Sequence, residues 1–595
     1  MVTTVSDLNA LASQVSGSPA GPVLALVPFR QVADNGYACH DDRTPLQMMR
    51  IVDRKRVALD ELLSVLPADE VTLTGGGFDL DDQAYERLVR SVISDEIGSG
   101  AGSNFVLKRT YEAHVNGFSA RTALAMYRRL LQHESGSYWT LLINTGNRVL
   151  LGATPERQVS VRDGVVTMNP ISGTLRYPPG GIELDDVLAF LADGKETDEL
   201  CMVLDEELKI MARVCEGGGR VIGPELREMA QVAHTGYDIV GTSTRPPAEV
   251  LRETLCAPTV VGSPVENAYR VIGRHERHGR GYYSGAIALF DRDAAGRPTM
   301  DSAILIRTAE IDTSGRLHLA VGATLVRHSD PAAEAAETAA KAAGFLRALR
   351  VDCRRPTVAP HDRRLSEHPL VRSALAARND GLADFWLGLG RPRHDPVLLG
   401  RHALVLDAED RFTAMLTQQL RGLGLAVTIR RCDEADIDDV RTTDLLVAGP
   451  GPGDPHADRD PRIASLLRTI RVRIEAGRPL LAICLSHQVL CRHLGLPLAR
   501  RPVPNQGAQH AVDLFGTRAR VGFYNTFVAV STVDTMATGP YQVEIARDSA
   551  TGEVYATRSA LFASLQFHPE SVLSPDGYPV LGDLLCDLLG GQAPS

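Results

Sequence analysis

From about residue 397 the chain alternates short, continuous apolar runs with segments in which apolar residues recur at helical spacing. Short apolar runs are typical of strands buried on both faces, and a helix after each strand indicates a parallel sheet with crossover connections. The pattern therefore predicts a doubly wound α/β domain. Its expected strands are 397–406, 444–448 and 480–484, and its expected helices are 412–423 and 462–476.

The first 350 residues show no such regular alternation. The second of two long helical patterns begins with a proline directly after an aspartate, a combination that favours a helix start. We expect an α+β domain over 1–350 and the α/β domain over 397–595. The expected strands of the first domain include 138–143, 302–306 and 317–321, and its long helices cover 196–214 and 331–349.

Residues 351–396 are rich in Arg, Pro and His. This composition is typical of a solvated linker rather than of a binding patch. One short amphipathic helix is expected inside the linker, around 370–389.

Composition narrows the functional classes. A net charge of -10 argues against a protein that neutralises nucleic-acid phosphates. No apolar run approaches the roughly 18 residues needed to cross a bilayer. The 9 cysteines contain no Cys-x-x-Cys pair, and the first twenty residues contain no Lys or Arg, unlike a signal peptide. We therefore expect a cytoplasmic protein with neither nucleic-acid nor membrane partners.

A cysteine stands where an expected buried strand turns into a helix, in the run PLLAICLSHQ at 479–488. At such an elbow a nucleophile sits in a strained turn that requires small neighbours, and Ala482 and Ser486 are small. The helix N-terminus that follows lowers the pKa of a thiol. A lone cysteine is more often a buried structural residue, so a catalytic Cys484 needs support from elsewhere in the chain.

Two further motifs supply that support. The run AGPGPGDP at 448–455 follows an expected strand, and its glycines leave backbone N–H groups open to an oxyanion. In LQFHPES at 565–571, His568 and Glu570 lie two apart on an extended segment and point to the same side. Glu570 can then orient His568, which can activate Cys484.

The three motifs resemble those of the class I (triad) glutamine amidotransferases. The resemblance implies that Cys484 is the nucleophile, His568 the base and Glu570 its orienting partner. The family usually has Gly where this chain has Ala482 and Ser486. Further implied contacts to L-glutamine come from the oxyanion strand, from the helix after the nucleophile and from the backbone of the run YNTF at 524–527, namely Gly451, Gly453, Gln488 and Thr526.

Two helical segments of the first domain carry paired glutamates. Glu196 and Glu199 share one helix face, as do Glu334 and Glu337, and Lys341 follows one turn later. One such pair is usually a solvated face. Two converging pairs would form a carboxylate cluster suited to Mg²⁺, a cation that takes oxygen ligands.

Several tight polar turns accompany these helices. Each of these turns, considered alone, is more often structural than functional. They are GATPER at 152–157, NPISGT at 169–174, APTVVGSP at 257–264 and RGYYSG at 280–285, together with the arginine of ILIRT at 304–308. An arginine such as Arg307 can bind a carboxylate with two parallel hydrogen bonds.

Together and in this order, these motifs resemble the chorismate-utilising enzymes, whose fold is an α+β arrangement of layered sheets with surrounding helices. The resemblance implies that Glu199 and Glu337 bind Mg²⁺ directly, that Glu196 and Glu334 act through waters, and that Glu156 protonates the leaving C4 hydroxyl. His234 matches an active-site histidine of the family. The residues implied to hold the substrate are Arg307, Tyr283, Thr259, Gly322, Lys341, Ser172, Thr174 and Asn104.

Two positions discriminate between the reactions of this family. Water-using members carry a lysine base where this chain has Asn104, and a neutral residue suits ammonia, which needs no deprotonation. Aminodeoxychorismate synthases carry a nucleophilic lysine where this chain has Ser172. With the addition of water and the amination at C4 both disfavoured, amination at C2 is the reaction that remains.

Departures from the anthranilate synthases, such as Leu200 in place of a histidine, resemble the phenazine-pathway 2-amino-2-deoxyisochorismate (ADIC) synthases, which have the same fused order. The resemblance implies C2 amination without loss of pyruvate, with chorismate and L-glutamine as substrates, and a homodimer. A fused anthranilate synthase remains an alternative, because His234 is retained. A scaffold without turnover is a second alternative, against which the intact triad and the four glutamates argue.

Overall fold

The computed structural model describes residues 2–16, 21–178, 181–229, 232–350, 364–390, 393 and 395–590. Its internal contacts divide the chain into two compact units. Unit 1 comprises Met1–Glu96, Asn104–Val203 and Gly223–Ala377, and unit 2 comprises Ile97–Ser103, Leu204–Ile222 and Arg378–Ser595.

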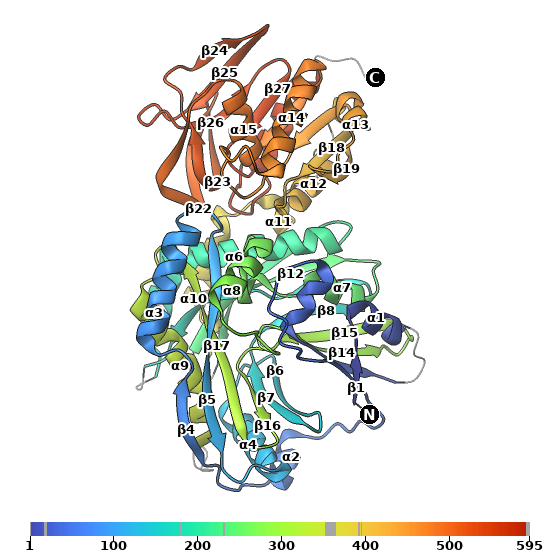
Figure 1. The fold of residues 1–595 in the computed structure, drawn as a ribbon, viewed down its shortest axis with the longest axis vertical. Helices are drawn as coiled ribbons and strands as arrows, with labels where there is room; N and C mark the ends of the chain where they lie inside the picture. Colours follow the sequence, from blue (N-terminus) through green and yellow to red (C-terminus); the bar gives the residue numbers. More distant parts are fainter. Residues whose placement is uncertain are drawn as a thin grey trace. The chain divides into compact units, whose positions relative to one another are not determined.

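Two sheets with antiparallel pairing form the frame of unit 1 (Figure 1). The larger sheet has the order β1-β3-β2-β14-β15-β8-β9-β12-β10, with β11 paired to β12. Its strands are β1 (Val2–Val5), β2 (Val23–Val27), β3 (Leu46–Arg50), β8 (Arg157–Arg162), β9 (Val165–Met168), β10 (Ile171–Arg176), β11 (Arg220–Glu228), β12 (Val232–Thr242), β14 (Ala286–Arg292) and β15 (Pro298–Ile304).

The smaller sheet of unit 1 has the order β13-β5-β17-β16-β7-β6, with β4 paired to β5. Its strands are β4 (Leu73–Phe78), β5 (Asn104–Val115), β6 (Trp139–Asn144), β7 (Arg148–Thr154), β13 (Gly262–Ser263), β16 (Thr308–Asp312) and β17 (Arg316–Val326).

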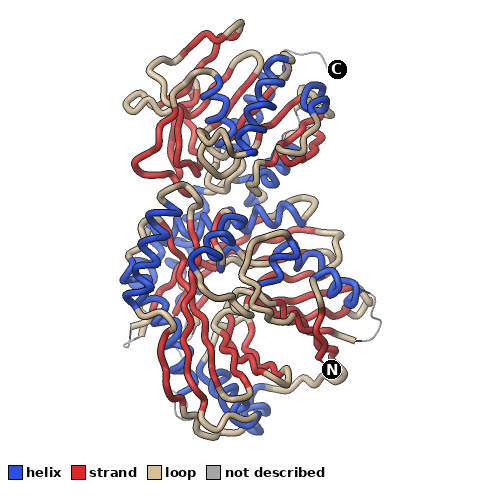
Figure 2. The backbone as a smooth tube through the Cα atoms, in the orientation of Figure 1, coloured by secondary structure: helices blue, strands red, loops and turns tan. Residues whose placement is uncertain are grey.

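The two sheets of unit 1 bury apolar side chains against each other. Leu26 and Ile287 of the larger sheet share a core with Leu150 of the smaller one. The next residue on β7, Leu151, points to the opposite face and packs with helices α4 (Ala120–His133) and α9 (Pro331–Arg350). Figure 2 distinguishes these strand layers from the flanking helices. The remaining α-helices are α1 (Leu8–Ser16), α2 (Leu59–Val65), α3 (Asp82–Ser91), α5 (Leu184–Ala192), α7 (Pro247–Thr254), α8 (Val265–His275) and α10 (Pro369–Ala377). Three short 3-10 helices, η1 (Phe29–Asn35), η3 (Pro258–Val260) and η4 (Leu365–Glu367), and one π-helix, η2 (Val92–Ile97), accompany them.

Unit 2 contains a sheet of order β19-β18-β20-β21-β27-β26-β25-β24 and a separate hairpin of β22 and β23. Strands β19 to β27 along this order are parallel, and the others are antiparallel. The strands are β18 (His402–Asp407), β19 (Ala426–Arg431), β20 (Leu445–Ala448), β21 (Leu480–Ile483), β22 (Leu498–Leu514), β23 (Thr517–Ala529), β24 (Thr535–Thr538), β25 (Tyr541–Arg547), β26 (Val554–Arg558) and β27 (Phe562–Leu565).

Helices cover both faces of the parallel strands. Val405 belongs to a core shared with α12 and α16, whereas Leu404 and Leu406 belong to a second core shared with α14 and α15. Successive side chains therefore enter different cores, which explains the continuous apolar runs. The helices of this unit are α11 (Asp384–Leu387), α12 (Phe412–Gly422), α13 (Ile437–Thr442), α14 (Pro461–Glu475), α15 (Leu485–His493) and α16 (Gly577–Gly590), with a short turn η5 (Arg378–Gly381).

The expected fold classes, α+β followed by doubly wound α/β, are confirmed. Four element bounds were wrong. The strand expected at 302–306 is Pro298–Ile304, and the strand expected at 317–321 is Arg316–Val326. The strand expected at 397–406 begins at His402, because Gly400 has a φ of 79° that a strand does not accept. The single helix expected at 370–389 is two helices, α10 and α11, separated by a turn around Asn379 and Gly381.

Helix α6 (Gly194–Val214) is continuous but contributes to both units. Its residues up to Val203 belong to unit 1, and those from Leu204 onward belong to unit 2. The described part of the expected linker is likewise divided, since Ala377 ends a segment of unit 1 and Arg378 begins one of unit 2. Residues 351–363 lie outside the described residues.

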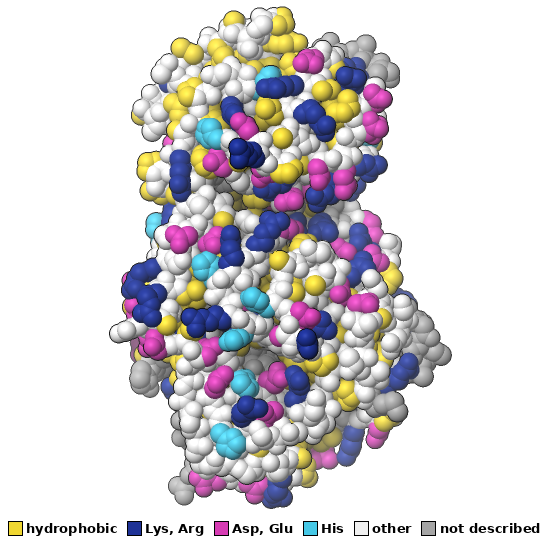
Figure 3. Space-filling model, viewed as in Figure 1, with side chains coloured by type: hydrophobic (Ala, Val, Ile, Leu, Met, Phe, Trp, Pro, Cys, Tyr) yellow, Lys and Arg dark blue, Asp and Glu magenta, His cyan; other side chains and the backbone are white. Residues whose placement is uncertain are grey.

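On the face in Figure 3, acidic and basic side chains are interspersed. Within the described ranges, no helix combines the length and apolarity required to span a bilayer. The cysteines in those ranges are free thiols.

Trp386 tests the assignment of residues 378–390 to unit 2. Its side chain is 1% exposed, and its Nε1–H donates to the Glu570 carbonyl oxygen at 2.8 Å. We expect Trp386→Ala to destabilise unit 2 by about 3–5 kcal/mol and Trp386→Phe, which removes the hydrogen bond but keeps a ring, by roughly 1 kcal/mol. Calorimetry would measure both. An unchanged thermal unfolding transition in Trp386→Ala would show that this segment is not part of the unit 2 core.

Candidate active sites

Cys484 occupies a sharp turn between β21 and α15. Its φ of 52° and ψ of -105° are strained for a residue with a side chain, as expected of a nucleophile elbow. The side chain is only 5% exposed. Ser486, the small neighbour noted in the sequence, anchors the turn by donating to the Gly449 carbonyl oxygen at 2.6 Å.

His568 and Glu570 form the buried partner pair of this thiol. The distance from His568 Nδ1 to Glu570 Oε1 is 2.8 Å, and the thiol of Cys484 acts electrostatically on the same ring. The carboxylate accepts from Nδ1–H, which leaves Nε2 to take the thiol proton. Burial disfavours the charged ring, but Cys484 and Glu570 outweigh it and raise the pKa of His568 well above its usual value. The three residues can therefore generate a thiolate–imidazolium pair.

The predicted glutamine-binding segments surround the elbow. A Cβ on Gly451 would lie 2.6 Å from the Ala408 carbonyl oxygen, so only glycine fits there, and Gly453 has a φ of 123°. Gln488 Nε2 donates to the Phe527 carbonyl oxygen at 2.8 Å, which fixes the strand that carries Thr526. Direct contact of these residues with glutamine stays a prediction.

In unit 1, Arg307 and His234 form the centre of a second site. Arg307 donates to His234 Nε2 at 2.9 Å, so the His234 proton resides on Nδ1, 2.7 Å from the Gly173 carbonyl oxygen. Burial and the neighbouring Arg307 lower the pKa of His234 to about 3, which keeps the ring neutral. Thr174 lies 3.4 Å from the same ring nitrogen.

A cavity of about 230 Å³ adjoins this centre. Thr174, Arg307, Glu337 and Lys341, all predicted from the sequence, line it. Sequence reasoning missed Glu134, Arg176, Tyr177 and Met229 in the same lining. Arg176 follows Thr174 by two residues on β10, and alternation along a strand was the one available signal for it.

Lys341 links α9 to the smaller sheet. Its Nζ donates to the Gly322 carbonyl oxygen at 2.8 Å and lies 2.8 Å from Glu337 Oε1. Burial opposes the charge, but Glu337 raises the pKa of Lys341 overall, so the ammonium persists. A Cβ on Gly322 would meet the Tyr283 hydroxyl, so Tyr283 and Lys341 approach the same point of β17.

Glu156, in the short connection between β7 and β8, is 3% exposed. Burial raises its pKa to about 8, while the Thr259 hydroxyl and the cations Arg227 and Arg307 oppose the rise. The carboxyl group is therefore protonated at neutral pH, as a general acid requires. Asn104, at the start of β5, is 4% exposed, and its backbone pairs with Ser263 and Val326.

The four glutamates are placed in pairs on two helices. Ser172 Oγ donates to Glu199 Oε1 at 2.7 Å, and a Cβ on Gly173 would collide with Glu196 Oε2, so both α6 glutamates approach one turn. Glu334 is 5% exposed on α9. In the described chain no three His, Cys, Asp or Glu side chains are yet gathered around a possible metal position. An all-carboxylate oxygen donor set still fits Mg²⁺ in chemistry.

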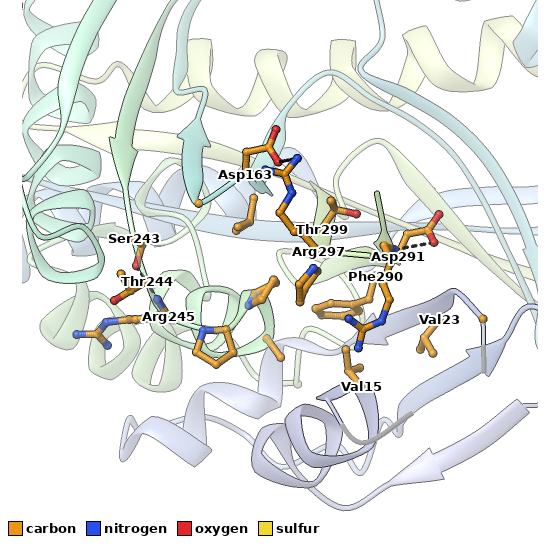
Figure 4. A pocket seen from close by; sticks show the side chains of 18 residues that line it. Val15, Val23, Asp163, Ser243, Thr244, Arg245, Phe290, Asp291, Arg297 and Thr299 are labelled. Atoms are coloured by element: carbon orange, nitrogen blue, oxygen red, sulfur yellow. Dashed lines mark hydrogen bonds and ion pairs between the residues drawn. The ribbon is translucent and has the colours of Figure 1, made fainter. Parts of the chain in front are cut away.

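Another cavity of unit 1, of about 520 Å³, lies away from these residues (Figure 4). Arg297 and Asp163 form an ion pair inside it, and Phe290 and Val23 contribute apolar surface. Its lining contains none of the residues predicted from the sequence as functional.

Two models of known protein families match this chain. Residues 61–347 match the family of chorismate binding enzymes, and residues 404–588 match the class-I glutamine amidotransferases. The resemblance to both families that the motifs indicated is therefore confirmed.

Three curated relatives align with most of this chain. The "Anthranilate synthase, phenazine specific" of Pseudomonas chlororaphis is 50% identical, with 98% of this chain and 90% of that protein aligned. The protein of the same name from Pseudomonas fluorescens is 49% identical over the same shares. The "Anthranilate synthase" of Azospirillum brasilense is 31% identical over 78% of this chain and 60% of that protein. The chain therefore belongs to the family of chorismate-binding enzymes fused to a class-I glutamine amidotransferase, which includes the phenazine-specific anthranilate synthases.

Proposed function

We propose that the protein uses ammonia from L-glutamine to aminate chorismate at C2, giving ADIC and glutamate without elimination of pyruvate, for phenazine or related secondary-metabolite biosynthesis. The relatives of about 50% identity, whose names specify phenazine, support this assignment. The observation that carries it is the neutral pair Asn104 and Ser172, at the positions where related enzymes have a lysine base and a lysine nucleophile. Ser172 is engaged in a hydrogen bond to Glu199.

Glutamine hydrolysis would proceed at the elbow of unit 2. His568 takes the Cys484 proton, and the thiolate attacks the side-chain amide of glutamine. Backbone N–H groups around Gly451 and Gly453 stabilise the oxyanion. Collapse of the tetrahedral intermediate releases ammonia with a proton from His568, and water then frees glutamate from the thioester.

Amination would follow in unit 1. The nitrogen lone pair forms a bond to C2, the ring double bonds shift, and the C4–O bond breaks. Glu156 gives its proton to the departing oxygen, so water leaves, and the nitrogen gives up one proton in return. Ammonia needs no base before attack, which suits the uncharged Asn104. The cavity cations Arg307 and Lys341 hold the substrate carboxylates.

Mg²⁺ completes the proposed site. Glu199 and Glu337 would hold the ion directly and Glu196 and Glu334 through water molecules, so that its charge offsets that of the carboxylates. We also propose that the enzyme acts as a homodimer in the cytoplasm, on the resemblance stated above.

A fused anthranilate synthase is the second candidate. His234, which the family uses in the lyase step, is retained in a neutral state next to Arg307. The names of the relatives also refer to anthranilate.

Product analysis separates the two candidates. With chorismate, glutamine and Mg²⁺, the purified protein should consume chorismate and form glutamate in equal amounts, with no pyruvate. Chelation of Mg²⁺ should stop chorismate consumption. Mass spectrometry of the product and a coupled pyruvate assay provide the measurements. Stoichiometric pyruvate together with fluorescent anthranilate would establish the second candidate instead.

Cys484→Ala should abolish glutamine-dependent activity while chorismate consumption with ammonium salts stays within about twofold of the wild type, because the amination site contains no part of the triad. Cys586→Ala, which alters a half-buried thiol on α16, is the matched control and should retain both activities. Loss of the ammonium-driven reaction in Cys484→Ala would contradict this division of labour.

Glu156 should impose a pH dependence on amination. A carboxyl group with a pKa of about 8 keeps its proton below that pH and loses it above, so the rate should fall as pH rises through about 8. The assay uses a constant concentration of free ammonia. Glu156→Gln should lower kcat roughly 100-fold or more and remove this limb of the profile. A wild-type rate that stays constant above about pH 8 would show that Glu156 is not the general acid.

A further inference from the structure

Asp205, on helix α6, is a buried carboxylate in unit 2 that the proposed mechanism does not use. Its side chain is 0% exposed. The segment Leu204–Ile222 joins unit 2 although it lies in the sequence among the residues of the chorismate-binding family match. A buried carboxylate is costly unless donors replace its water, so the identity of those donors indicates what the residue serves.

All three donors to Asp205 flank the triad. The backbone N–H of Val572 donates to Oδ1 at 2.7 Å, and the Tyr524 hydroxyl donates to Oδ2 at 2.8 Å. The Ser571 hydroxyl also donates to Oδ2. Ser571 and Val572 directly follow Glu570, and the carbonyl oxygen of Tyr524 lies 3.7 Å from Cys484 Sγ. One carboxylate therefore fixes both the chain after the triad glutamate and the strand beside the nucleophile.

The next turn of the same helix supports the other side of the triad. Lys209, four residues after Asp205, is 3% exposed, and its Nζ lies 3.6 Å from the centre of the Phe412 ring. The Phe412 ring in turn lies 4.3 Å from the His568 ring, centre to centre. Residues four apart share a helix face, so one face of α6 contacts both the Glu570 segment and the support of His568.

We propose that Asp205 is a positioning residue for glutamine hydrolysis: it holds the Glu570–Val572 segment so that Glu570 keeps His568 aligned with Cys484. Asp205 itself touches neither glutamine nor the reacting atoms in this role. The proposal rests on the glutaminase function proposed for the Cys484 site. Burial raises the pKa of Asp205 to about 6, against the lowering effect of its three donors, so the carboxylate remains an acceptor at neutral pH.

The test compares Asp205→Ala and Asp205→Asn in the full-length protein. Asp205→Ala should lower kcat for glutamine hydrolysis about 10- to 100-fold and leave KM within about twofold, because misalignment affects catalysis more than binding. Asp205→Asn should recover much of the rate, since its amide can still accept from Val572 and donate to the two hydroxyl oxygens. Ammonium-driven chorismate consumption in the same preparations verifies that the protein is folded and should remain within about twofold.

Asp548 provides a matched control in unit 2. It accepts from the backbone N–H groups of Ala550 at 2.9 Å and Thr551 at 2.7 Å, from the Thr551 hydroxyl at 3.0 Å and from the Tyr555 hydroxyl at 3.3 Å, so its donors are of the same kinds as those of Asp205. Asp548→Ala should leave kcat for glutamine within about twofold. An equal loss in Asp548→Ala and Asp205→Ala would attribute the effect to general destabilisation and overturn the proposal.

A double-mutant cycle with Ser571→Ala makes the test specific. Because Asp205 and Ser571 share one hydrogen bond, the loss of kcat in the double variant should be clearly smaller than the product of the two single losses. Independent, multiplying effects would refute the positioning role, as would an unchanged kcat in Asp205→Ala. If the wild type itself hydrolyses no glutamine, the proposed function fails, whereas a wild-type glutaminase unaffected by Asp205→Ala refutes this inference alone.

Discussion

A buried carboxylate that has lost its hydrating water needs hydrogen-bond donors from the protein. At Asp205 this need links segments of the chain that are far apart in sequence. The acceptor lies on α6, and its donors lie on β23 and just after Glu570. The same helix bears Glu196 and Glu199 in its unit 1 part. Helix α6 therefore carries polar side chains that are buried, among them Asp205 and Lys209.

At each site the surroundings of a side chain, rather than its residue type, determine whether it is protonated. Burial keeps Glu156 protonated and His234 neutral, so unit 1 offers an acid and an uncharged imidazole at neutral pH. In unit 2, Glu570 and Cys484 favour a charged His568 in spite of equal burial. Two histidines in one chain thus take opposite states because one lies beside an arginine and the other beside a carboxylate and a thiol.

Much of the architecture could be predicted from local pattern. The capping aspartate before α9 accepts from Ala333 N–H at 2.8 Å, as the sequence indicated. The strand–elbow–helix at Cys484 and the pairing of His568 with Glu570 were also predicted correctly. Errors arose at Gly400, whose positive φ interrupts the expected strand, and at Arg378–Gly381, where a short 3-10 helix interrupts the expected helix. Glu134 and Tyr177, which line the cavity beside Arg307, belong to no sequence motif, so only the tertiary structure identifies them as part of the site.

The sequence by itself determined the two fold classes, the strand-to-helix turn at Cys484, the His568–Glu570 pair and the paired glutamates on two helices, because each depends on residue type and short-range spacing. Only the tertiary structure decided which unit a segment joins. The assignment of Leu204–Ile222 and Arg378–Leu389 to unit 2 depends on buried contacts made by Asp205, Lys209 and Trp386. Such contacts join residues hundreds of positions apart, and burial, which sets both their strength and the pKa values at the sites, is a property of the packed molecule.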